Sequence, residues 1–301
     1  MKFVTFRAGR DAPKPGLVVE EGGKPRSVLD LSKSASLPSI LALIQGGEAA
    51  LSAAREIAGK GDGLVPWADI QLMAPIPRPL KNVFCVGRNY SEHVAEGYRA
   101  RGQEVKLPEV PQFFTKPPTA VAAPGQPFEH DESLTTKLDY EVELALVIGK
   151  AGRDIPADRA YDHIFGYTIA NDITARDLQR RHEQWFKGKG LDGSCPMGPW
   201  IVHKSALPDP QRLRIWLEVN GEKRQDSNTE HMIFKIPQII ESLSRGLTLE
   251  PGDVIATGTP SGVGYAMDPP QLLKADDLVT CHVEGIGQLS TPIVARGGAG
   301  A

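Results

Sequence analysis

The chain has 301 residues, 41% of them hydrophobic and 24% charged, so it can bury a large core in one big domain or two unequal ones. Its formal net charge of −3 argues against a general binder of nucleic acids or membrane surfaces. No stretch is apolar for long enough to span a bilayer, and Met1–Arg7 lacks the apolar core of a signal peptide. The 3 cysteines are widely spaced, which fits small core residues in a reducing cytoplasm.

The first 75 residues are expected to form a small N-terminal α/β domain. Their patterns predict three strands and then two helices, over 2–7, 15–20, 27–31, 38–45 and 48–58. The proline-rich stretch 74–80 predicts an extended linker, so the second domain is expected over 76–301. The first segment carries no residues that suggest chemistry.

The short strand predicted over 82–86 leads to a helix signal near Ser91. His93 and Glu96 are three residues apart, so on a helix they share a face and can hydrogen-bond. A carboxylate beside an imidazole orients it as a general base needs, although a surface helix with a His and an acid is the alternative.

The polar stretch 97–109 predicts either a mobile lid or a long loop. Lys116, between an aromatic strand and two prolines, either faces a site or is solvated.

The stretch Leu138–Ile148 is predicted to be one strand, because it is rich in β-branched residues and alternates with a period of two. Glu141 and Glu143 would then point the same way, about 7 Å apart, on a strand buried on both faces beyond residue 144. Two carboxylates at the edge of a buried region repel each other unless a cation lies between them. The pair therefore indicates a metal site, with a solvated strand face as the alternative.

A third acid, Asp172, stands where a strand predicted over 165–170 meets a helix predicted over 173–185. It could cap that helix or supply a third oxygen ligand beside the glutamate pair. Within the helix, Arg176 shares a face with Gln179 and with Arg180.

Two glycine-rich loops follow. The run 187–199 has too much glycine for a helix and lacks the spacing of a phosphate-binding loop, so its lysines are either aimed at an anion or solvated. The run 257–264 can offer backbone N–H groups and hydroxyls to a carboxylate, with a plain glycine turn as the alternative.

Taken together and in this order, these motifs resemble the fumarylacetoacetate hydrolase family. The matching segments lie within 80–294 and are Gly-Arg-Asn-Tyr-Ser-Glu-His at 87–93, Asp-Tyr-Glu-Val-Glu-Leu at 139–144, Asn-Asp-Ile-Thr-Ala-Arg-Asp-Leu-Gln at 171–179, Lys-Gly-Leu-Asp at 189–192, Cys-Pro-Met-Gly-Pro at 195–199 and Thr-Gly-Thr-Pro-Ser-Gly-Val-Gly at 257–264. The resemblance implies an α+β, β-rich fold, a twisted mixed β-sandwich roll, with the small N-terminal domain that many bacterial members carry. It also implies a homodimer, while the cytoplasmic location is the expectation from the cysteines.

The resemblance also implies roles for individual residues. A divalent cation would be held by Glu141, Glu143 and Asp172, and ligation by carboxylates alone favours Mg²⁺ first and Mn²⁺ next. The remaining assignments are catalytic roles for His93, Glu96 and Lys189, and substrate contacts for Arg176, Gln179 and Thr259. Lys116 is predicted to contact the substrate from its sequence position rather than from the resemblance.

The activity implied is metal-dependent hydrolysis of the C–C bond of a 1,3-diketo acid, such as the acylpyruvate fumarylpyruvate, in the catabolism of aromatic or related compounds. Within the family, oxaloacetate decarboxylation or tautomerisation and isomerisation of hydroxymuconate-type dienes are alternatives, because they need a stabilised enolate but no attacking water. Outside the enzymes, a non-catalytic protein that binds a metal or an anion is the alternative. A nucleotide-binding enzyme fits poorly, because neither glycine-rich loop has the required spacing.

Overall fold

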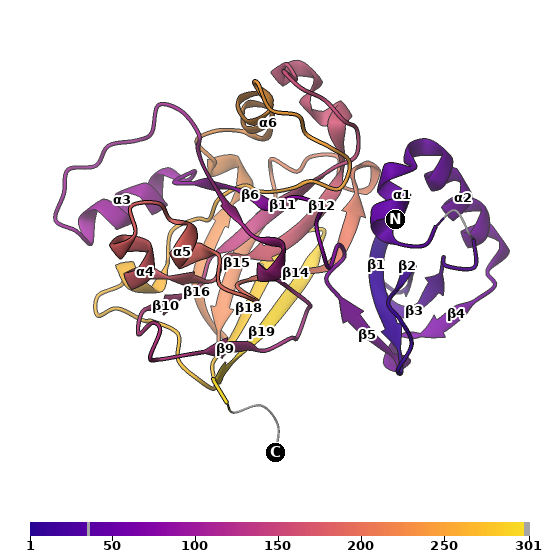
Figure 1. Ribbon diagram of the computed structural model, residues 1–301, viewed down its shortest axis with the longest axis horizontal. Coiled ribbons are helices and arrows are strands. Elements are labelled where there is room, and N and C mark those ends of the chain that lie inside the picture. The colour runs from indigo at the N-terminus through magenta and orange to yellow at the C-terminus, as the bar shows by residue number, and fades with distance from the viewer. Residues whose placement is uncertain (35–36, 298–301) are drawn as a thin grey trace.

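The computed structural model describes residues 1–34 and 37–297, and its main feature is a large mixed sheet (Figure 1). Ten strands follow one path in the order β4-β3-β2-β1-β14-β12-β11-β17-β6-β7, while β5 pairs with β1 and β8 with β14. The bounds of these strands are β1 Lys2–Ala8, β2 Lys14–Glu21, β3 Lys24–Asp30, β4 Leu64–Pro66, β5 Ile70–Met73, β6 Val83–Gly87, β7 Gln112–Lys116, β8 Val121–Ala122, β11 Val142–Ile148, β12 Ile164–Asn171, β14 Cys195–His203 and β17 Val254–Ala256.

A second sheet packs against β11, β12 and β14 of the first. Its order is β16-β15-β18-β19-β9, with bounds β16 Glu222–Asn228, β15 Arg214–Val219, β18 Leu278–Val283, β19 Gly287–Ala295 and β9 Phe128–His130. Alternate residues of β15 and β18, such as Leu217 and Cys281, are buried in one core with Leu144 and Leu146 of β11. Sheet-on-sheet packing of this kind makes a sandwich, so the α+β, β-rich fold predicted from the sequence is confirmed.

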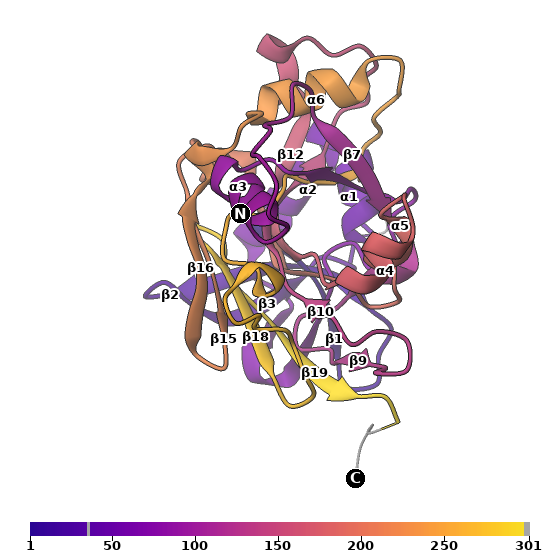
Figure 2. The same ribbon diagram turned by 90° about the vertical axis from the view of Figure 1, so that its left-hand side faces the viewer.

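The helices lie around the two sheets and have the bounds α1 Ile40–Gln45, α2 Gly47–Lys60, α3 Ser91–Arg99, α4 Arg176–Arg181, α5 Phe186–Lys189 and α6 Ile236–Ser244. Figure 2 shows α3 on one side of the molecule, and α4 and α5 together on the other. Over the described ranges, no helix is long and apolar enough to cross a membrane.

The N-terminal strands and helices lie beside the main body in Figure 1. They continue the large sheet, because β1 pairs with β14 through Phe3 and Ile201. Phe3 and Leu43 share a buried cluster with Val147 of the central strand. The division into domains over 1–75 and 76–301 stays a prediction.

The predicted strand over 138–148 is wrong in its first half, where the chain changes partner. Leu138–Asp139 form β10, which pairs with β13 (Thr174–Ala175), whereas β11 pairs with β12 and β17. Asp139 accepts hydrogen bonds from Arg176 and from the backbone N–H of Gly264, and these contacts hold the short strand β10 away from the path of β11. All of β11 is buried, as predicted beyond residue 144.

The helix predicted over 173–185 is also wrong in extent. It begins at Arg176, ends at Arg181, and is preceded by Ala175 rather than capped by Asp172. The run 187–199 was expected to contain no helix, but its first residues belong to α5 (Phe186–Lys189), which starts where Trp185 packs edge-on against Phe114 with ring centroids 5.6 Å apart. This tertiary contact outweighs the low helix propensity of the glycine-rich sequence.

Candidate metal and acid–base site

Three carboxylates meet where β11 and β12 pair. Glu143 lies on β11, Glu141 directly before it, and Asp172 directly after β12. The register, with Val142 opposite Asn171, brings these strand ends together. Each acid offers an oxygen within 4.8 Å of the others, and all three are at most 4% exposed. The structure therefore brings together the three acids that the sequence pointed to.

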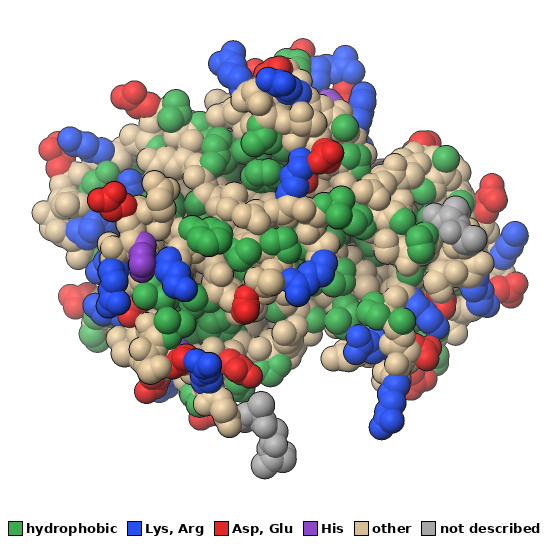
Figure 3. Space-filling model, in the orientation of Figure 1, with side chains coloured by type: hydrophobic (Ala, Val, Ile, Leu, Met, Phe, Trp, Pro, Cys, Tyr) green, Lys and Arg blue, Asp and Glu red, His purple; other side chains and the backbone are tan. Residues whose placement is uncertain are grey.

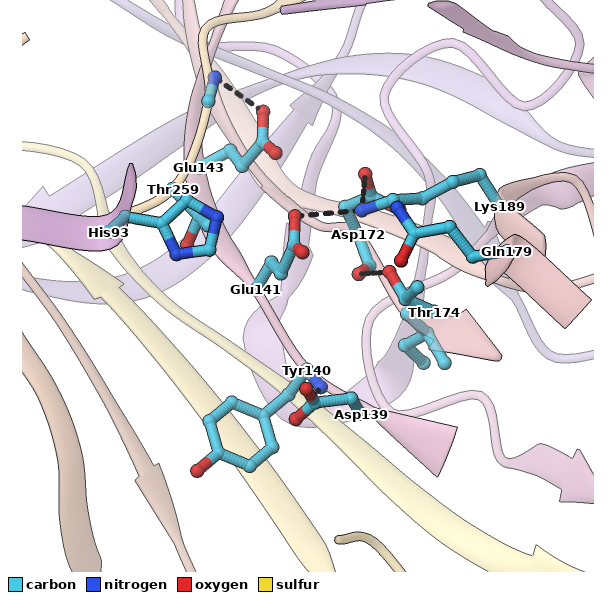
Figure 4. Close-up of polar contacts among 12 residues, drawn as sticks. His93, Asp139, Tyr140, Glu141, Glu143, Asp172, Thr174, Gln179, Lys189 and Thr259 are labelled. Atoms are coloured by element: carbon cyan, nitrogen blue, oxygen red, sulfur yellow. Dashed lines mark hydrogen bonds and ion pairs between the residues drawn. The ribbon is translucent and has the colours of Figure 1, made fainter. Parts of the chain in front are cut away.

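Buried cations surround two of these acids, as Figure 4 shows for Lys189. The Lys189 Nζ lies 2.9 Å from Glu141 Oε2 and 2.8 Å from Asp172 Oδ2. Arg176 Nη1 lies 2.8 Å from Glu141 Oε1, and Lys116 Nζ lies 2.6 Å from Asp172 Oδ1. Burial alone would raise the pKa of Glu141, but Lys189 and Arg176 outweigh it and hold that pKa at about 2.

Glu143 has no such partner among the described residues, because its carboxylate accepts a hydrogen bond only from the backbone N–H of Gly258, at 2.8 Å. Burial, together with the negative charges of Asp172 and Glu141, raises the pKa of Glu143 well above its ordinary value. Gly258 has φ +97°, and a Cβ there would lie 2.8 Å from the Asn89 Cβ, so only glycine brings this N–H to the carboxylate.

The donor set fits a hard divalent cation. Asp139 pairs with Arg176 through Nε at 2.8 Å, so four buried carboxylates share three buried cations, namely Lys116, Arg176 and Lys189. One negative charge is left over, and it falls on Glu143. A cation held by the carboxylate oxygens of Glu141, Glu143 and Asp172 would neutralise it, and oxygen ligands suit Mg²⁺ or Mn²⁺.

His93 and Glu96 form the hydrogen bond that their spacing predicts. The His93 Nδ1 lies 2.8 Å from Glu96 Oε1, and since a carboxylate only accepts, Nδ1 carries the hydrogen and Nε2 is left free. The other oxygen of Glu96 accepts from the Gly262 N–H at 2.8 Å, which fixes α3 against that loop. In Figure 4, Glu141 lies between His93 and Lys189.

A cavity of about 310 Å³ opens over this cluster and is lined by residues of α3, α4 and α5. Six of the residues singled out from the sequence line it, namely His93, Glu141, Arg176, Gln179, Lys189 and Thr259. Lys116 lies elsewhere, since it is fully buried behind Asp172 and donates to the backbone carbonyls of Ile173 and Lys189. Its position suits holding Asp172 and the α5 turn in place.

Sequence reasoning assigned no role to Asp139 or to Gln225. Asp139 orients Arg176, and the one available signal was an acid two residues before the Glu-x-Glu pattern. Gln225 donates from Nε2 to Thr259 Oγ1 at 2.9 Å and so positions that hydroxyl. It lies in a polar strand, whose pattern carries no signal for a site residue.

A buried carboxylate triad that could hold a metal lies beside a lysine and a His–Glu pair, and together they define a candidate active site. The model for the fumarylacetoacetate (FAA) hydrolase C-terminal family matches residues 82–294. The chain therefore belongs to the fumarylacetoacetate hydrolase family, as its motifs indicated.

Curated relatives cover nearly the whole chain. Oxaloacetate tautomerase YisK of Bacillus subtilis is 45% identical over 92% of this chain and 95% of its own length. The mitochondrial oxaloacetate tautomerase fahd2 of Xenopus laevis is 39% identical over 98% and 90%.

Solved structures of similar proteins support the assignment to this family. A fumarylacetoacetate hydrolase of Exiguobacterium antarcticum is 41% identical, with TM-score 0.83 over 98% of this chain and 100% of its own. A maleylpyruvate hydrolase of Sphingobium sp. SYK-6, in complex with manganese(II) and pyruvate, is 29% identical, with TM-score 0.78 over 98% and 99%. The relatives thus include a tautomerase and a hydrolase on one fold.

Proposed function

We propose that this protein is a metal-dependent oxaloacetate tautomerase, which interconverts the enol and keto forms of a small dicarboxylic 2-oxo acid. The observation that carries the proposal is the free Nε2 of His93, held by Glu96 on the side of Glu141 away from Lys189. An enol–keto conversion needs such a proton-transfer group beside a site that stabilises an enolate. The names of two curated relatives, which align over nearly their full length, support the same substrate.

The reaction moves one proton and breaks no C–C bond. In the enol-to-keto direction the enol O–H proton passes to solvent as the C2 carbonyl forms, and the electrons of the C=C bond take up a proton at C3. The reverse reaction removes the proton from C3 and returns one to the C2 oxygen. His93 Nε2 would give or take the proton at C3, and Glu96 would stabilise the imidazolium through Nδ1. Lys189 would donate a hydrogen bond to the charge that develops on the C2 oxygen, a contact typically worth about 3 kcal/mol in other enzymes.

Glu141, Glu143 and Asp172 would hold the cation, for which we propose Mg²⁺, with Mn²⁺ as the next choice. When bound, the cation supplies Lewis-acid stabilisation of enolate charge. The carboxylate end of the substrate would be bound by Arg176, Gln179 and Thr259, since all three line the cavity. For Arg176 this role is shared with its ion pairs to Asp139 and Glu141.

Hydrolysis of an acylpyruvate is the second candidate, because the same His–Glu pair can take a proton from water. The hydroxide would attack the acyl carbonyl, and the C–C bond would break to leave the pyruvate enolate in the site. The likeness to a fumarylacetoacetate hydrolase at 41% identity and to maleylpyruvate hydrolase at 29% supports this reading, against 45% and 39% for the two tautomerases.

An ultraviolet assay distinguishes the two candidates. Purified protein with Mg²⁺, with and without EDTA, is given the enol of oxaloacetate, acetylpyruvate or fumarylpyruvate. EDTA-sensitive acceleration of enol loss with no pyruvate formed is expected. Release of pyruvate from the diketo acids, with the oxaloacetate enol unaffected, would make the protein a hydrolase instead.

The quaternary structure and the domain division are also proposals. We expect a homodimer, which sedimentation equilibrium tests. We expect residues 76–301 to fold as the catalytic domain, although the pairing of β1 with β14 predicts that this piece alone loses stability.

A further inference from the structure

Three arginines that line the cavity have no carboxylate partner. Arg88 directly follows β6, Arg101 comes two residues after the end of α3, and Arg180 lies on α4. In residues 1–34 and 37–297 none of the three forms an ion pair, whereas Arg176 in the same cavity has two buried carboxylates as partners. Figure 3 shows Lys and Arg side chains gathered on the surface over α3 and α4.

Aromatic rings hold Arg88 in place. Its guanidinium carbon lies 5.5 Å from the centre of the Trp185 ring and 5.8 Å from that of Tyr98. Its backbone has φ +55°, a conformation that residues other than glycine rarely adopt. Contact with a ring face leaves the N–H edges of a guanidinium free to donate, so Arg88 is oriented and available to an anion.

The same rings connect Arg88 to the candidate catalytic cluster. Trp185 packs edge-on against Phe114, and the Phe114 ring centre lies 5.2 Å from the Lys189 Nζ. Gly87 makes room for Trp185, because a Cβ at that position would come within 2.3 Å of the indole. Arg88 is therefore fixed relative to Lys189 through two packed rings.

Arg180 of α4 is held in a similar way against an aromatic ring. Its guanidinium carbon lies 5.3 Å from the ring centre of Tyr265, and that of Arg176 lies 4.5 Å from the same ring. Glu183 also lines the cavity but lies beyond ion-pair distance of every described cation. Cationic groups outnumber acids in the lining, so the cavity favours an anion with more than one charge.

We propose that Arg88 and Arg180 bind the second carboxylate of the substrate, and so select dicarboxylic 2-oxo acids over monocarboxylic ones. The inference rests on the proposed function, in which the 2-oxo-acid end lies at Lys189 and the carboxylate triad. An arginine fork matches a carboxylate with two parallel hydrogen bonds, which a neutral group cannot replace. Arg88 and Arg180 are thus specificity residues of the cavity.

The test compares oxaloacetate with 2-oxosuccinamate, in which a neutral amide replaces the second carboxylate. The wild-type protein should prefer oxaloacetate by about 10- to 100-fold in kcat/KM, the range expected for charged hydrogen bonds. Arg88→Gln and Arg180→Gln should each bring this ratio toward one while leaving kcat/KM for 2-oxosuccinamate nearly unchanged. Arg88→Lys keeps the positive charge but lacks the two parallel donors of a guanidinium. Its preference for oxaloacetate should fall between those of the wild type and of Arg88→Gln.

Arg181→Gln is the matched control, because Arg181 neighbours Arg180 on α4 but does not line the cavity. It should keep the wild-type ratio. An equal loss for both substrates in Arg88→Gln and Arg180→Gln, or a wild-type protein without preference, would overturn the subsite. If neither substrate is turned over, the proposed function fails on its own, and the dissociation constants of the two compounds, measured by calorimetry with Mg²⁺, decide on the subsite.

Discussion

Glu141 and Glu143 are two residues apart, yet Glu141 lies within 2.9 Å of both Lys189 and Arg176. Within residues 1–34 and 37–297, Glu143 accepts a hydrogen bond only from the backbone N–H of Gly258. One buried carboxylate is thus paired and its neighbour is not. An unpaired buried charge costs folding free energy, and a bound cation removes that cost.

Neutralising the two glutamates should change the stability of the metal-free protein in opposite directions. Glu143→Gln removes an uncompensated charge and should raise the free energy of unfolding, whereas Glu141→Gln removes a partner of two buried cations and should lower it. About 1–3 kcal/mol is expected in each case. Urea unfolding with EDTA measures both, and similar destabilisation by the two substitutions would contradict the charge count at the site.

Metal removal should lower the stability of the wild-type protein but not that of Glu143→Gln. Binding at 100 times the dissociation constant adds about 2.7 kcal/mol to the free energy of unfolding. Thermal unfolding with Mg²⁺, Mn²⁺ or EDTA checks this, and Asp172→Asn serves as a second ligand variant. If Mg²⁺ stabilised the wild type, Glu143→Gln and Asp172→Asn equally, the ion would bind somewhere other than the three carboxylates.

His93→Gln should lower kcat by about 10²–10⁴-fold, the usual contribution of a general acid or base. The affinity for the cation should stay the same, because His93 is not one of the clustered carboxylates. Glu96→Gln should have a smaller effect, since an amide oxygen can still accept from His93 Nδ1. Steady-state kinetics and calorimetry separate the two effects, and an unchanged kcat in His93→Gln would remove this residue from the mechanism.

The cysteines should be inert in the folded protein. Cys85, Cys195 and Cys281 are buried and unpaired, as the sequence predicted for small core residues. Burial raises the pKa of the Cys195 thiol to about 12 and raises the pKa of the other two thiols as well, so the reactive thiolate stays scarce from about pH 7 to 9. Labelling with an aromatic disulfide should find no thiol before denaturation and 3 after it. Rapid labelling of the native protein would contradict the packing of these side chains.

The acids and the His–Glu pair could be found from the sequence because local rules place them. Spacing of three on a helix sets the His93–Glu96 contact, and the ends of neighbouring strands bring Asp172 to the glutamates. Lys189 entered through the family resemblance, and the structure places it on α5 between Glu141 and Asp172.

Other features depend on contacts distant in sequence, which no local pattern reports. The strand pairing changes between β10 and β11, around Tyr140, because Asp139 accepts hydrogen bonds from Arg176 and from the Gly264 N–H. The turn of α5 depends on Trp185 contacting Phe114. The place of Lys116 behind Asp172 depends on β7, which pairs with β6 and ends at Lys116. Gln225 orients Thr259 from a different sheet, so its role could not be read from its own strand.

The most direct test of the account is proton NMR of oxaloacetate in D₂O with the Mg²⁺-loaded protein. The account predicts accelerated exchange of deuterium into C3 with all four carbons retained, and loss of that acceleration in His93→Gln and with EDTA. Accumulation of pyruvate without faster exchange at C3, or acceleration that survives both EDTA and His93→Gln, would contradict a metal-dependent tautomerase that uses this site.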